Sequence, residues 1–106
     1  MKSMNKVQLL GYLYGDPVIG EDDNGELFAK VRLMTSYRLR TNEVKTTWHD
    51  VLFWGEAKIK LLSNQFISGS HVLIEGTIQY KKYTNAKGTV FRHPEINAVH
   101  FMNLDH

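Results

Sequence analysis

The sequence predicts an all-β fold, a small five-stranded barrel with one helix between its third and fourth strands. Apolar and polar residues alternate through five stretches, as they do in strands with one buried face, and a single stretch has helical spacing. The chain has 106 residues, of which 42% are hydrophobic and 23% charged, so it is long enough for one modest core. We therefore expect one folded domain spanning residues 1–106.

The first two strands are expected at residues 5–14 and 27–36. Gly15-Asp16-Pro17 is expected to end the first strand, and Asn24-Gly25 is a strong hairpin signal before the second. Within 27–36 one face is apolar, because strand side chains alternate between the two faces. The other face is basic and apolar together and carries Phe28, Lys30, Arg32 and Met34.

The remaining elements follow from the same patterns. Residues 45–54 read as a third strand with Trp48, Asp50, Leu52 and Trp54 on one face. Residues 56–67 have helical spacing, and Gly69 stands just beyond as a C-terminal cap. A fourth strand covers 72–78, a turn falls at 85–88, and a fifth strand covers 89–104, in which Pro94 predicts a bulge or a free edge.

Five strands with one helix after the third is the element order of the OB-fold, a five-stranded Greek-key barrel. OB-folds bind oligonucleotides and oligosaccharides on the face of strands 2 and 3 and on the loops that join strands 1–2 and 4–5. The nature of the ligand is therefore indicated by the side chains that lie there.

The net charge of +2 is unevenly distributed along the chain. Residues 15–26 hold five acidic residues and no Lys or Arg, so the rest of the chain holds all 13 basic but only 6 of the 11 acidic residues. A basic surface attracts phosphate polymers or anionic lipids, although many such imbalances are only solvated faces. Charge alone does not choose between these readings.

Aromatic and basic side chains are interleaved where an OB-fold binds its ligand, as single-stranded nucleic acid requires. Bases stack on flat rings for about 1–3 kcal/mol each, while Lys and Arg neutralise phosphates. The alternative is that Trp48 and Trp54 are core residues, and that Arg38 and Arg40 only solubilise a turn. The expected stacking residues are Phe28, Trp48, Trp54 and Tyr83, and the expected phosphate ligands are Lys30, Arg32, Arg38, Arg40, Lys81, Lys82 and Lys87.

Catalysis and metal binding find little support in the sequence. The chain has no cysteine, and the neighbours His49 and Asp50 point to opposite faces of a strand, so they cannot form a His–carboxylate relay. The histidines have no metal-ligand spacing, and the acidic segment matches no calcium loop. We expect no enzyme, no metal and no cofactor. No apolar stretch is long enough for a membrane span and no secretory signal is present, so we expect no membrane partner and a cytoplasmic protein.

Four segments, in order, resemble the bacterial single-stranded DNA-binding protein family. They are residues 5–11 (NKVQLLG) with Asp16-Pro17, Thr35-Ser36, residues 48–55 (WHDVLFWG) and residues 69–76 (GSHVLIEG). The resemblance covers nearly the whole chain. It implies sequence-tolerant binding of single-stranded DNA in replication, recombination and repair, without catalysis, in the cytoplasm at the nucleoid.

The resemblance also implies residue roles and an assembly. Trp48, Trp54 and Tyr83 match base-stacking aromatics, and His49 matches a residue at a subunit interface. The first strand matches the element through which subunits pair, usually into a homotetramer. This would account for Tyr12 and Tyr14, which could otherwise be covered by the barrel's own loops.

The sequence departs from the family in three respects. A stacking Trp common between strands 2 and 3 has no clear counterpart, and the acidic Asp50 and Glu56 stand where basic residues are common. The chain ends at Asp105-His106 without the linker and acidic tip through which family members recruit repair and replication enzymes, which puts tail-mediated recruitment in doubt. Either the full-length protein lacks that arm or the sequence is only a domain.

Two other hypotheses stay open. One is a replication-restart adaptor that uses the same fold mainly for protein contacts, and the other is an enzyme or an RNA chaperone.

Overall fold

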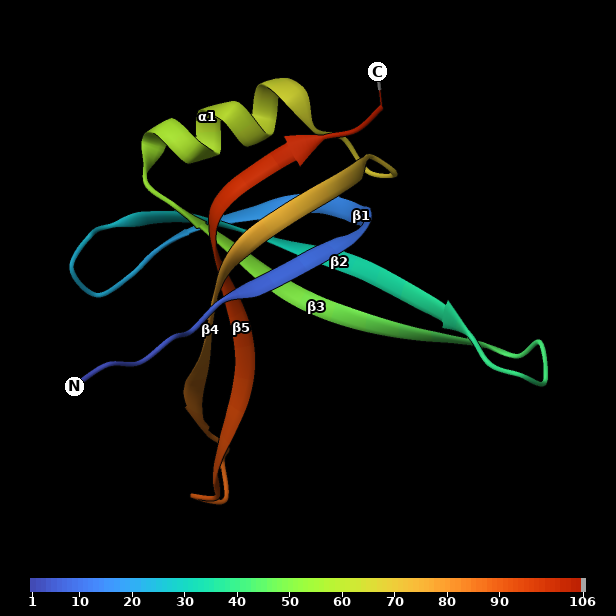
Figure 1. Cartoon of the computed structure of the whole chain (residues 1–106). Coiled ribbons are helices and arrows are strands. Elements are labelled where there is room, and N and C mark those ends of the chain that lie inside the picture. The colour runs from blue at the N-terminus through green and yellow to red at the C-terminus, as the bar shows by residue number, and fades with distance from the viewer. Residues whose placement is uncertain (106) are drawn as a thin grey trace.

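The computed structural model describes residues 1–105, which form five strands and one helix (Figure 1). The elements are β1 (Val7–Glu21), β2 (Leu27–Arg38), β3 (Val44–Trp54), α1 (Glu56–Gln65), β4 (His71–Thr84) and β5 (Val90–Asn103). The strands close into a barrel in the order β1-β2-β3-β5-β4, and β4 pairs back with β1. The β3–β5 pair is parallel and the other four pairs are antiparallel. The predicted five-stranded barrel with one helix after the third strand is confirmed.

The core lies inside the barrel, on the faces that the alternation predicted to be apolar. Leu62 and Phe66 close one end of it from α1 and from the residue after α1, and Figure 1 shows the helix lying across that end. The buried hydrophobic side chains of the strands in this core are Leu13, Ala29, Val31, Leu33, Val51, Phe53, Val72, Ile74, Ile96 and Ala98, whereas Leu52 is buried on the outer face of β3. Burial of this apolar surface is the main stabilising contribution to the fold.

Strand β1 does not end at Gly15-Asp16-Pro17 as the sequence predicted. It bulges there instead, because the three residues between Tyr14 and Val18 lie opposite a single residue of β2, Val31. Gly15 has a φ of 79°, a left-handed conformation that glycine adopts without strain. Beyond the bulge β1 pairs again with β2 as far as Glu21, so the local breakers bend the strand without ending it.

Other predicted boundaries also differ from the structure. Strand β4 runs to Thr84, past the predicted end at residue 78, because it stays paired with β5 as far as Val90, so Lys81, Lys82 and Tyr83 lie on a strand. Helix α1 ends at Gln65, because Phe66 has an extended backbone with φ −128° and ψ 136°, and Gly69 lies in the following turn rather than capping the helix. The register irregularity of β4–β5 lies between Glu75 and Gly76, not at Pro94. Pro94 pairs with Tyr80 on β4, and the pairing of β5 with β3 begins only at Ile96. The other edge of β5 is therefore unpaired at Pro94, which agrees with the predicted free edge.

Two long hairpins extend from the barrel in different directions, β2–β3 and β4–β5 (Figure 1). Their strands stay paired to the tips, from Phe28↔Trp54 to Arg38↔Val44 in one and from Thr77↔Asn97 to Thr84↔Val90 in the other. These hairpins carry most of the side chains predicted to bind a ligand. Among residues 1–105, no helix has the length and apolar character that crossing a membrane demands.

Candidate nucleic-acid interface

Trp48 lies on the outer face of β3 with Arg32 and Tyr14 against its ring. Its side chain is 41% exposed, so the alternative that Trp48 is a core residue is wrong. The guanidinium carbon of Arg32 is 4.5 Å from the ring centroid, a cation–π distance, and the Tyr14 ring meets Trp48 edge-on at 5.2 Å. The three residues come from β1, β2 and β3 and form one exposed aromatic and cationic surface.

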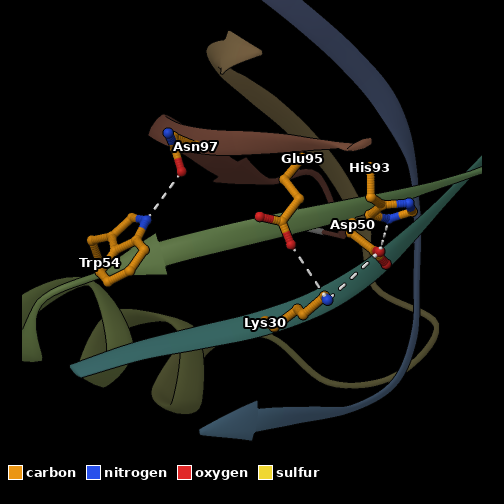
Figure 2. Close-up of polar contacts among 6 residues, drawn as sticks. All are labelled: Lys30, Asp50, Trp54, His93, Glu95 and Asn97. Atoms are coloured by element: carbon orange, nitrogen blue, oxygen red, sulfur yellow. Dashed lines mark hydrogen bonds and ion pairs between the residues drawn. The ribbon is translucent and has the colours of Figure 1, made fainter. Parts of the chain in front are cut away.

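Trp54 lies at the end of β3, half-buried, with its ring held on two sides. Its indole N–H donates to Oδ1 of Asn97 at 3.0 Å, and its ring centroid is 5.1 Å from that of Phe28 (Figure 2). Phe28 and Trp54 are opposite each other in the β2–β3 pairing. The sequence placed these two rings on one face, but it gave no signal for Asn97, which fixes the indole.

Tyr83 lies near the tip of the β4–β5 hairpin among three side chains. Its ring stacks on Phe91 with centroids 5.8 Å apart, and Lys81 Nζ is 5.5 Å from the ring centroid. His93 meets the same ring edge-on at 6.2 Å. Phe91 is 49% exposed and was missed by the sequence analysis. Counting back across the turn at 85–88 would have found it, since Phe91 pairs directly with Tyr83.

Lys30, which the sequence predicted to bind phosphate, is paired with two carboxylates. Its Nζ is 3.4 Å from Oε2 of Glu95 and 3.8 Å from Oδ2 of Asp50 (Figure 2). His93 Nε2 is 2.5 Å from the same Asp50 oxygen. The acidic Asp50 therefore has two partners of its own, and Lys30 is neutralised within the protein.

The other predicted cations are distributed over the two hairpins. Arg38 and Arg40 lie at the end of the β2–β3 hairpin, where both are exposed. Lys81, Lys82 and Lys87 lie on the β4–β5 hairpin, also exposed. Lys81 is on the Tyr83 face of β4, whereas Lys82 points to the opposite face because strand side chains alternate. The structure thus brings Lys81 to an aromatic ring and leaves Lys82 on the other side.

Tyr12 and His49, two of the predicted interface residues, have different surroundings from Tyr14. Tyr12 is 47% exposed and stacks on His71 with ring centroids 4.6 Å apart. His49 is half-buried, its Nε2 is 2.8 Å from Oγ1 of Thr35, and burial lowers its pKa below the usual 6.5. Burial therefore favours the neutral form of the His49 imidazole.

No group of three or more His, Asp or Glu side chains is arranged to hold a metal ion within residues 1–105. The Asp50–His93 pair links β3 to β5. Lys30 contacts its Asp50 side and the Tyr83 ring its His93 side. Flat rings and cations on an exposed sheet can stack planar groups and attract anions. The site is thus chemically suited to binding.

A closed β1-β2-β3-β5-β4 barrel with one helix after β3 is an OB-fold, a class of barrel that binds oligonucleotides or oligosaccharides on the face of strands 2 and 3. The exposed rings and cations of this chain lie on that face. Residues 4–104 match the model of the single-strand binding protein family. The chain belongs to this family, as its four sequence segments predicted.

Similar proteins of known name agree with this assignment. The chain is 34% identical over 92 residues to a single-stranded DNA-binding protein of Xanthomonas campestris and 32% identical over 91 residues to one of Rhizobium meliloti. These matches cover 82% and 81% of this chain and 52% of each relative, so the chain spans about half the length of the curated relatives it matches.

Among solved structures, the chain is similar to that of a Plasmodium falciparum SSB in complex with ssDNA. The TM-score is 0.86 at 25% sequence identity, and the match covers 99% of this chain and 98% of the other. The barrel and its two long hairpins therefore follow a known architecture almost from end to end.

Proposed function

We propose that this chain binds and protects single-stranded DNA with little regard to sequence, without making or breaking a bond. The observation that carries the proposal is the exposed Trp48 ring on the outer face of β3, with Arg32 against it, in a chain of the single-strand binding protein family. A duplex hides its base faces, whereas an unpaired strand offers them for stacking. The similarity to single-stranded DNA-binding proteins and to an SSB solved in complex with ssDNA supports this ligand.

In the proposed complex, bases stack on four rings. Trp48 and Trp54 serve on β3, Phe28 extends the platform of Trp54, and Tyr83 receives a base on the β4–β5 hairpin. We add Tyr14 to this surface rather than to a subunit interface, because its ring lies against Trp48. The apolar face of the first strand and the family resemblance had suggested the interface.

The phosphates follow the exposed cations of the two hairpins. Arg32 and Lys81 lie beside aromatic rings, so a strand whose bases stack there brings its phosphates close to them. Arg38, Arg40, Lys82 and Lys87 extend the positive surface outward. We leave Lys30 out of this set, because its charge is already matched by Asp50 and Glu95.

We further propose that a second copy of this chain covers the outer face of β1, in a homotetramer. Leu10 is 55% exposed and Tyr12 47% exposed, and they lie on one face of this strand. Replication, recombination and repair in the cytoplasm, at the nucleoid, are the proposed setting, because single-stranded DNA arises there.

The test is a tryptophan fluorescence titration with oligo-dT and with a duplex of the same length, at low and at moderate salt. We expect quenching by oligo-dT alone, and an affinity that falls with salt by about 0.7 in the log-log slope for each phosphate neutralised. Absence of quenching by oligo-dT, or equal quenching by the duplex, would contradict the proposal. An adaptor that acts through protein contacts would give the first of these results.

A further inference from the structure

A hollow of about 470 Å³ opens on the outer side of the barrel, between β2–β3 and the β4–β5 hairpin. Phe28, Leu52 and Trp54 line it on the β2–β3 side, and Gln79 and Tyr80 line it from β4. Its size is in the range of small-molecule sites, which are mostly apolar with a few placed polar groups. The hollow is therefore large enough for a planar ring beside Trp54.

Glu95 lines this hollow and has one oxygen without a partner. Its side chain is 2% exposed, Oε2 pairs with Lys30 Nζ, and Oε1 has no hydrogen bond although it is buried. Figure 2 shows the oxygen without a dashed line pointing away from Lys30, to the side where Trp54 lies. Buried acceptors are nearly always hydrogen-bonded, and a carboxylate can only accept. The site lacks an N–H donor, which a ligand can supply.

The charges around the hollow select the part of a nucleotide that can enter. Glu21 at the end of β1 and Asp22 and Asp23 in the turn after it line the same hollow, so with Glu95 it has four acidic residues. Lys30 is already paired with Asp50 and Glu95, which leaves Lys81 as the remaining cation among the lining residues. A phosphate is repelled from such a surface, whereas a neutral base is not.

We propose that this hollow is a nucleobase subsite in which Oε1 of Glu95 accepts a hydrogen bond from the exocyclic amine of a base, cytosine above all. The proposal rests on the proposed single-stranded DNA binding and adds a local preference to it. Carboxylates accept from the N4 amine of cytosine. Thymine has no amine, and its single N–H lies between two carbonyl oxygens, which a carboxylate repels.

The geometry also accounts for how the base is admitted and held. Gln79 and Tyr80 line the hollow and are exposed, and exposed side chains change rotamer within nanoseconds, so these two can adapt to an entering base without movement of the barrel. Trp54 is fixed by Asn97, which gives the entering base a preset surface along one side. Glu95 is likewise fixed by Lys30, which leaves Oε1 as the free acceptor.

The experiment compares oligo-dC with oligo-dT of equal length, for the unaltered protein and for Glu95→Gln, by anisotropy of end-labelled strands at pH 8 and one salt concentration. Glu95→Gln removes the charge from the acceptor of this hydrogen bond. We therefore expect the ratio of oligo-dC affinity to oligo-dT affinity to be about tenfold lower in Glu95→Gln than in the unaltered protein. The matched control is Asp50→Asn, which removes the other carboxylate from Lys30 and leaves Oε1 of Glu95 unchanged. We expect this control to keep the original ratio.

An unchanged ratio in Glu95→Gln, or an equal change in Asp50→Asn, would overturn the subsite. A second measurement needs no variant: an oligomer of 2-pyrimidinone, the cytosine ring without its amine, should bind the unaltered protein about tenfold more weakly than oligo-dC. Equal binding of the two strands would refute the role of the amine even if Glu95→Gln did not fold. Failure of the proposed function looks different, because then neither oligo-dC nor oligo-dT binds the unaltered protein.

Discussion

Replacing Trp54 by alanine tests most directly how this barrel holds DNA. The indole is fixed before any ligand arrives, by the 3.0 Å hydrogen bond to Asn97 and by Phe28 with its ring centroid 5.1 Å away. A ring that is already oriented loses little side-chain entropy when a base stacks on it. We therefore expect Trp54→Ala to lose most of the free energy that a stacked base can give.

The magnitude follows from the stacking contribution. One base on one ring contributes about 1–3 kcal/mol, and each 1.4 kcal/mol is a factor of ten in affinity. Preorientation favours the upper half of that range, about 2–3 kcal/mol, which weakens oligo-dT binding by about 30- to 150-fold. Trp54→Phe keeps a smaller aromatic face and loses the N–H bond to Asn97, and we expect a net effect of about 1 kcal/mol, or about fivefold.

Anisotropy of end-labelled oligo-dT is the assay of choice, because the variant removes one of the two tryptophans. Thermal unfolding by circular dichroism establishes that each variant is folded. Folded Trp54→Ala that binds oligo-dT within twofold of the unaltered protein would refute the stacking role of Trp54. If Trp54→Phe lost as much affinity as Trp54→Ala, the hydrogen bond to Asn97, and not the ring, would be the important element.

Four further predictions concern the charge, the fold, the pH response and the assembly. Lys81→Ala should reduce the slope of log affinity against log salt by about 0.7, measured by titration at four salt concentrations; an unchanged slope would remove Lys81 from the phosphate path. Gly76→Ala should lower the unfolding free energy by about 1–3 kcal/mol in urea denaturation, because a Cβ there collides with the Asn97 carbonyl oxygen. Burial lowers the pKa of His49 in the folded state, so the unfolded chain binds the proton more readily and stability should fall as pH drops below about 6.5. The unfolding midpoint should fall less between pH 8 and pH 5 in His49→Gln than in the unaltered protein, and an equal fall in both would contradict this. Tyr12→Glu should lower the mass found by light scattering at micromolar concentration, and a monomeric unaltered protein would remove the proposed tetramer.

The faces of the strands were predictable from the sequence, whereas the polar cluster behind them was not. Alternation is a local property, so it placed Trp48, Trp54, Phe28 and Arg32 on one outer face without knowledge of the barrel. The partners of Lys30 depend on which strands meet. Glu95 approaches it only because β5 closes the barrel beside β3.

The missed boundaries have a similar cause. Gly15 and Pro17 are strong local breakers, and they do produce a bulge at the expected place. The strand resumes because Val18 and the residues after it find hydrogen-bonding partners on β2, a gain that local signals do not contain. Lys30 was expected on the outer face and is found there, but a neighbouring strand supplied the carboxylates that neutralise it.

The closure of the barrel has a consequence for the binding surface. The parallel seam between β3 and β5 consists of two residue pairs, Val51↔Ile96 and Leu52↔Asn97. Asn97 thus pairs along this seam with its backbone and holds the Trp54 indole with its side chain. A fluctuation that separates β3 from β5 at this seam also displaces Asn97 from the Trp54 indole. The stability of the shortest strand pairing in the described barrel is therefore coupled to the orientation of a stacking ring.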